Sequence, residues 1–130
     1  MKKTALLIIP FLLVFASCLK GFDEGDCFSF AYAKIEEVTG PQSGTVGQNL
    51  QFSVDFTVVN GCGKFEKFEE IKSADTTYIR LIAKYEGCVC TQELKHLDTT
   101  YNFRPEKAGN LYLRFVQSET EYAERIITVQ

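Results

Sequence analysis

The chain has 130 residues, of which 45% are hydrophobic and 13% aromatic, enough apolar material for one globular domain and too much for a disordered polar chain. Its 14 basic and 17 acidic residues give a net charge of −3. This acidic balance argues against binding to nucleic acid and against electrostatic attraction to anionic lipid.

The first segment combines a basic start with a short apolar run. Lys2 and Lys3 are followed by apolar residues from Ala5 to Ala16. Twelve residues of helix would be about 18 Å long, well short of the roughly 30 Å hydrocarbon core of a bilayer. Pro10 would also weaken a permanent helix. The pattern therefore predicts an export signal rather than a membrane-spanning helix.

The end of this run, FASC at residues 15–18, resembles the lipobox of bacterial lipoproteins, with Phe15 in place of the usual leucine. The resemblance implies that residues 1–17 are removed and that Cys18 carries covalent lipid, the one bound group we expect. Several acyl chains would anchor the protein stably to a membrane. In the enterobacterial family an aspartate after the cysteine retains the protein at the inner membrane. Leu19 therefore favours the outer membrane, with the leaflet left open.

The mature chain would consist of a lipidated tether, residues 18–26, and one domain, residues 27–130. Without the two lysines of the signal it keeps 12 basic and 17 acidic residues, a net charge of −5. An ordinary secreted protein cut after Ala16 is the alternative. That cut would leave Cys18 as a fifth, odd thiol.

Alternation of apolar and polar residues predicts several short strands, most clearly at 51–58 and 77–85, whereas 27–38 and 100–103 are weaker candidates. We expect an all-β fold, an antiparallel immunoglobulin-like β-sandwich of about seven strands that is stapled by disulfides. The positions expected to face its core are Phe52, Val54, Phe56, Val58, Ile79, Leu81, Ala83, Tyr85, Leu111, Leu113, Phe115, Ile127 and Val129.

Residues 64–74 fit this alternation less well. Phe65, Phe68 and Ile71 are three residues apart, a spacing typical of helix. We expect a strand here, with one or two helical turns as the alternative.

The run from Tyr101 to Phe115 resembles the E–F corner and the following strand of immunoglobulin-like domains. In those domains a tyrosine folds its hydroxyl back onto the backbone. The resemblance implies this part for Tyr112, although Leu111 occupies the position where many such domains place the tyrosine.

Four cysteines remain after lipidation: Cys27, Cys62, Cys88 and Cys90. An even number in an oxidising compartment predicts two disulfides. If successive strands run antiparallel, all four lie at one end of the sandwich, as bonding distance requires. A Cys88–Cys90 bridge would close a small strained ring, so each of these two should pair with Cys27 or Cys62. The alternatives are a Cys₄ zinc site, which usually has two CxxC-type knuckles, and a redox-active Cys88-Val89-Cys90.

Residues typical of catalysis are scarce. His96 is the single histidine, in a polar segment that we expect to be a solvated loop, and no GxSxG sequence surrounds a serine. The neighbouring carboxylates of Glu36-Glu37 and Glu69-Glu70 would point to opposite faces of a strand and belong to the solvated surface. We therefore expect neither a catalytic residue nor a metal site.

The sequence thus favours a non-enzymatic, membrane-anchored envelope lipoprotein that binds a protein partner or belongs to a membrane-associated assembly. A protease-inhibitor-like or ligand-binding module is one alternative. A thiol–disulfide redox protein that uses the Cys-x-Cys pair is another.

The strand alternation also predicts which loops are free to bind. The cysteine end and the loop at 117–120 should lie near the membrane, because the tether enters there. The far end would hold the loops at 40–47, 72–77 and 105–110. Since loops on a rigid scaffold often carry recognition, we expect Lys72, Asp75 and Lys107 to contact the partner.

Overall fold

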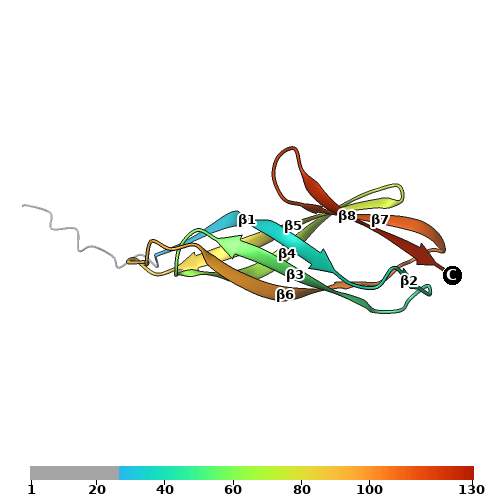
Figure 1. Ribbon diagram of the computed structural model, residues 1–130, viewed down its shortest axis with the longest axis horizontal. Helices are drawn as coiled ribbons and strands as arrows, with labels where there is room; N and C mark the ends of the chain where they lie inside the picture. The colour runs from blue at the N-terminus through green and yellow to red at the C-terminus, as the bar shows by residue number, and fades with distance from the viewer. Residues whose placement is uncertain (1–26) are drawn as a thin grey trace, which may run out of the picture.

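The computed structural model describes residues 27–130, where the regular secondary structure is entirely β-strand (Figure 1). The predicted signal, Cys18 and the tether lie outside the described residues. Within 27–130 no helix is long and apolar enough to cross a membrane. The strands are β1 (Phe28–Thr39), β2 (Ser43–Gly44), β3 (Leu50–Val58), β4 (Gly63–Ser73), β5 (Thr76–Glu86), β6 (Lys95–Phe103), β7 (Gly109–Val116) and β8 (Tyr122–Val129).

The strands form two layers that share β1. The larger sheet contains β2, β8, β7, β5 and β4 with the first half of β1, and the smaller sheet contains the second half of β1 with β3 and β6. β1 pairs with β5 from Phe28 to Ala33 and with β3 from Lys34 to Thr39. A bulge between Ile35 and Glu37 follows this change of partner. One continuous strand therefore ties the two layers together.

The expected disulfide-stapled β-sandwich is confirmed, with differences in detail. Two pairings are parallel, that of β5 with β7 and that of β2 with β8. The predicted tyrosine corner is wrong: Leu111 and Leu113 are buried, so Tyr112 between them faces outward. Within residues 27–130 its hydroxyl makes no hydrogen bond. The hydroxyl that does hold the backbone belongs to Tyr85, which accepts a hydrogen bond from the Val59 N–H at 3.1 Å.

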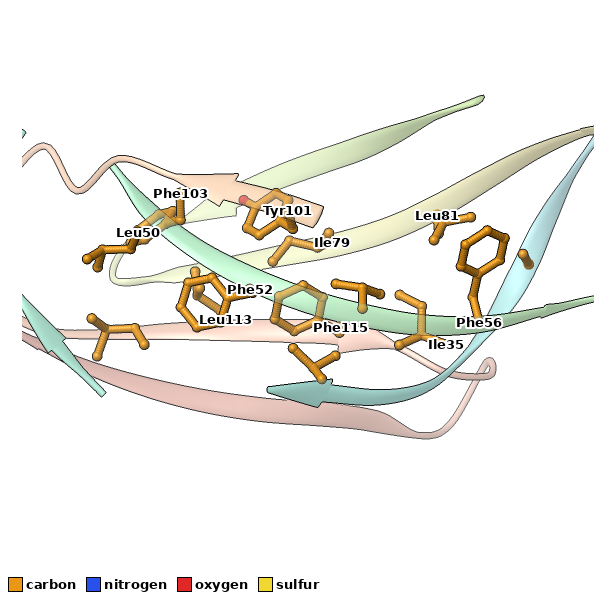
Figure 2. Close-up of a cluster of buried hydrophobic side chains, with 14 of the residues drawn as sticks. Ile35, Leu50, Phe52, Phe56, Ile79, Leu81, Tyr101, Phe103, Leu113 and Phe115 are labelled. Carbon is orange, nitrogen blue, oxygen red and sulfur yellow. The ribbon is translucent and has the colours of Figure 1, made fainter. Parts of the chain in front are cut away.

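The core lies between the two sheets (Figure 2). Every apolar position that the alternation predicted to face inward is buried. Phe52 and Phe115 are among the largest fully buried side chains, and their ring centroids are 6.2 Å apart. Tyr101 from β6 contacts Phe115 edge-to-face at 5.4 Å. Aromatic rings from both layers therefore form the centre of the core.

The spacing in 64–74 has a structural cause other than a helix. A bulge between Phe65 and Lys67 inserts one extra residue into β4. Phe65 and Phe68 consequently lie on the same side, and both contact the core. The two-residue alternation resumes after the bulge, so Ile71 faces solvent with 53% of its surface exposed. The segment is a strand, as expected.

Two disulfides close the end of the sandwich where the described chain begins. Cys27 is bonded to Cys88 and Cys62 to Cys90, with Cα atoms 5.0 and 5.4 Å apart. Gly87 lies between them and its N–H donates to the Cys27 carbonyl at 2.8 Å. Its φ is +142°, and a Cβ there would be 2.9 Å from the Cys62 Sγ, so the position requires glycine. The first bridge thus joins the start of β1, and the second the loop between β3 and β4, to the segment that follows β5.

Tyr101 closes the side of the sandwich between β6 and β4. Its ring contacts Phe68, with centroids 5.1 Å apart, and its hydroxyl donates to Glu70 Oε1 at 2.8 Å. Burial first, and then the hydrogen bond to the Glu70 carboxylate, raise the pKa of Tyr101 far above its usual range.

Tyr101→Phe should change how stability depends on alkaline pH. A raised folded-state pKa means that the Tyr101 contribution is complete below the unfolded pKa of about 10 and is lost as pH rises above it. Near neutral pH we expect the variant to be less stable by about 1 kcal/mol, because one hydrogen bond is missing. Above about pH 10 wild type should lose stability faster, so the difference shrinks. Urea unfolding at several pH values measures this, with Tyr112→Phe as the control. If the free energy of unfolding depended on pH in the same way for wild type and Tyr101→Phe, a raised pKa of Tyr101 in the folded state would be excluded.

Ala74 in the turn between β4 and β5 offers a second test. Its φ is 52°, in the left-handed region, which costs a residue with a Cβ about 1–2 kcal/mol. Glycine avoids this strain but is more flexible in the unfolded chain. Ala74→Gly should therefore raise the free energy of unfolding by about 0.5–1 kcal/mol, whereas Ala31→Gly in extended β1 should lower it by a similar amount. Equal destabilisation by both in urea titrations would exclude the left-handed turn.

Candidate functional site

The end of β4, its turn into β5 and the loop at 105–110 lie at the end opposite the disulfides (Figure 1), and the predicted partner-binding residues Lys72, Asp75 and Lys107 line one pocket there. Lys107 Nζ forms an ion pair with Asp75 Oδ1, and Lys72 Nζ lies 3.2 Å from Glu106 Oε1. The Tyr112 N–H donates to the Asp75 carbonyl at 2.8 Å. The charges are exposed, but each is paired within the chain. They hold the β4–β5 turn against the loop at 105–110.

The loop at 117–120 does not lie at the cysteine end, as the sequence predicted. β7 runs parallel to β5 but pairs only with Thr76–Ile79, so the β7–β8 hairpin ends midway along the sandwich (Figure 1). There Gln117 Nε2 donates to the Glu36 carbonyl at 3.1 Å. The parallel pairing of β7, which the sequence did not reveal, moved this loop.

His96 lies on strand β6 instead of in a loop. It is exposed, and its Nδ1 is 3.1 Å from Thr57 Oγ1 on the neighbouring strand. The part of the chain that the structure describes has no cluster of three or more His, Cys, Asp or Glu side chains arranged to hold a metal. Glu36 and Glu37 flank the β1 bulge and both are exposed.

The cysteines are bonded to distant partners. Cys88 and Cys90 are joined to Cys27 and Cys62, and not to each other. The Cys88–Cys90 bridge that a redox-active Cys-x-Cys pair would form is therefore absent from this structure, and so is the set of free thiolates that a zinc site would need.

The outer face of the larger sheet carries exposed aromatic side chains that the sequence analysis did not single out. Strand register places them on one surface, since directly paired residues share a face. Phe28, Phe30 and Tyr32 on β1 are 51%, 52% and 58% exposed, and Tyr122 on β8 is 45% exposed. We call this surface the aromatic face; its residues are Phe28, Phe30, Tyr32, Tyr78, Tyr112 and Tyr122.

Cationic side chains lie over these rings. The Arg114 guanidinium is 4.6 Å from the Tyr122 ring centroid, and Lys84 Nζ is 5.4 Å from that of Phe28. Arg114 also forms an ion pair with Glu124 at 2.7 Å. This pair and the Tyr78 hydroxyl raise the pKa of Arg114 further. Lys84 likewise pairs with Glu86 at 3.3 Å. The face therefore presents aromatic rings together with cations, two of which are already paired with carboxylates.

A signal for this face was present in the sequence. Phe28, Phe30 and Tyr32 alternate with Ser29 and Ala31. Alternation indicates that the three aromatics share a side but does not say which side is covered. Ser29 and Ala31 share the side of their buried partners Tyr85 and Ala83 but are themselves exposed, so the first half of β1 is open to solvent on both sides.

The model of one protein family, described as the ORF11 beta-sandwich domain, matches residues 52–124, more than half of the chain. The match begins within β3 and ends within β8, so it includes all of β4 to β7. No curated protein and no solved structure matches the chain.

Proposed function

The chain belongs to the ORF11 beta-sandwich domain family, and we propose that it is a non-enzymatic binding module whose aromatic face contacts a protein partner. The observation that carries this proposal is the exposure of that face. Phe30 and Tyr32 leave more than half of their surface in solvent. An exposed apolar patch of this kind marks interaction sites in soluble domains.

The chemistry of the face supports a protein partner. Tyrosine and arginine are the residue types that dominate the energetics of protein interfaces, because they provide a large contact area at little cost in conformational entropy. Here Arg80, Lys84 and Arg114 are already held against rings. Lys84 and Arg114 are also paired with Glu86 and Glu124, whereas Arg80 has no ion pair among residues 27–130. We therefore infer a partner surface with apolar side chains and an acidic group, which Arg80 would orient.

We also propose that lipid on Cys18 anchors this module in the bacterial envelope, at the outer membrane. The support is the lipobox-like sequence at 15–18 and the position of the first described residue. Only Leu19 to Asp26 separate Cys18 from Cys27, and eight residues reach at most about 29 Å. The disulfide end would then stay near the bilayer, and the aromatic face would lie along the side of the sandwich.

Cys18→Ala should release the protein from the membrane or stall removal of the signal, because the acyl chains are the proposed attachment. Fractionation of cells, together with the mass of the mature wild-type protein, measures this. We expect added lipid mass on residue 18. A processed variant that sediments with membranes by itself would rule out the anchor.

Two double variants distinguish the aromatic face from the far-end loops. Phe30→Ser with Tyr122→Ser removes rings from the face, and Lys72→Gln with Lys107→Gln removes charges from the loops. All four side chains are exposed, so we expect thermal unfolding to stay within a few degrees of wild type. Capture of the native partner from solubilised envelopes, identified by mass spectrometry against the wild-type protein, is the measurement.

We expect the face variant to lose capture by tenfold or more and the loop variant to retain it. The reverse result would support the far-end recognition that the sequence predicted and exclude the aromatic face. Loss in both variants at unchanged stability would mean that the partner contacts the end and the face together, contrary to the proposal.

A further inference from the structure

A cleft interrupts the aromatic face at the point where β5 changes its neighbour. On this edge of β5, β7 pairs with Thr76–Ile79 and β1 pairs with Leu81–Glu86. Arg80 lies between the two paired stretches. The two neighbours do not meet there, and a cleft of about 430 Å³ opens between Tyr32 and the start of the β7–β8 loop.

The cleft is mainly apolar. Buried Ala33 and Leu81 form its floor, and Tyr32 and Val116 form its sides. The Gln117 side chain at its rim already donates to the Glu36 carbonyl, and so orders the loop next to the cleft. The volume lies within the range of about 300–1,000 Å³ that is typical of small-ligand sites.

Two cations line this cleft, Lys34 and Arg80. Lys34 pairs with Glu36 at 2.8 Å, whereas Arg80 has no ion-pair partner among residues 27–130. The Arg80 Cζ lies 5.0 Å from the Tyr32 ring centroid, and its side chain makes no hydrogen bond within the described part of the chain. Its partner across the strands, Glu69, accepts instead from the Tyr32 hydroxyl at 2.8 Å. Arg114 on the same face, by contrast, pairs with Glu124. The stacked guanidinium therefore keeps its planar set of N–H donors for an added acceptor.

We propose that this cleft binds an apolar group that carries one carboxylate. The guanidinium of Arg80 would hold the carboxylate through two parallel hydrogen bonds, and the apolar group would lie against Val116, Leu81 and Tyr32. The ligand is either a small free acid or the carboxyl-terminal residue of a peptide, since both present this chemistry. The inference rests on the cleft and not on the proposed partner function.

Glu119, a carboxylate at the rim of the cleft, allows a separate test of whether the cleft binds an acid. It lines the cleft from the 117–120 loop but does not pair with Arg80. A fixed carboxylate at the rim would repel the ligand's carboxylate and compete for the guanidinium. Glu119→Gln should therefore strengthen binding of the acid, and it should not affect a neutral ligand of the same shape.

The experiment titrates the mature protein with 3-phenylpropionate and with 3-phenylpropan-1-ol, followed by amide chemical shifts. A second arm uses Gly-Gly-Phe peptides with a free or an amidated carboxyl terminus. We expect saturable shifts at Tyr32, Val116 and Gln117 with an acid, and at least tenfold weaker binding of its neutral analogue. Binding of both acids would mean that a small acid suffices. Binding of the free peptide alone would identify a peptide terminus as the ligand.

Three variants test the role of Arg80. Arg80→Met keeps the apolar stem and should abolish the preference for the acid, while Arg80→Lys keeps the charge but loses the bidentate geometry and should weaken binding several-fold. Lys84→Gln, a cation on the same face outside the cleft, should change nothing. Failure of every probe to bind the folded wild-type protein would overturn the proposal. So would equal binding of acid and neutral analogue, or an Arg80→Met variant that still prefers the acid.

Discussion

The structure depends on the passage of β1 from one sheet to the other. Its first half is hydrogen-bonded to β5 and its second half to β3, so the two layers cannot separate without breaking the pairing of one strand. Arg125 strengthens the crossing from the opposite sheet, because its Nε donates to the Val38 carbonyl at 3.0 Å. Because β1 leaves the larger sheet, it pairs with only half of one edge of β5. β7 pairs in parallel with the other half, Thr76–Ile79, and the cleft opens at Arg80 between the two paired stretches.

The same passage bears on why aromatic rings are exposed. The first half of β1 presents Phe28, Phe30 and Tyr32 on the outer side of the larger sheet, and β1 residues are buried only from Ala33 onward, where the strand begins to cross to the other layer. The disulfide from Cys27 to the segment after β5 fixes the start of this half-strand. The rings therefore stand on a backbone held at both ends, by a covalent bond and by the sheet crossing. Such preorganisation lowers the entropic cost of binding.

Sequence patterns predicted the parts of the fold that depend on local alternation. Strands such as 51–58 can be recognised because one side of the strand faces the core and the other faces solvent, and strand direction alone places the cysteines at one end. The segment with Phe65 and Phe68 did not fit the alternation because a bulge shifts the two-residue period by one residue. The sheet crossing, the parallel β7 and the cleft depend on pairing between distant segments, which leaves no trace in local periodicity. Charged residues in loops, by contrast, can be read from the sequence, and for this reason the sequence predicted partner binding at the loops.

The far-end loops and the aromatic face differ in what a partner would have to displace. At the far end Lys107 and Asp75 already neutralise each other, so a charged partner would exchange one exposed ion pair for another, with little net gain. On the face, contact removes apolar rings from water, a gain of about 25 cal/mol for each Å² of apolar surface. Arg80 adds a guanidinium whose orientation Tyr32 has already fixed and whose charge has no partner among the described residues. Binding at the face therefore adds interactions that residues 27–130 do not supply among themselves, and this asymmetry is the physical argument for placing recognition there.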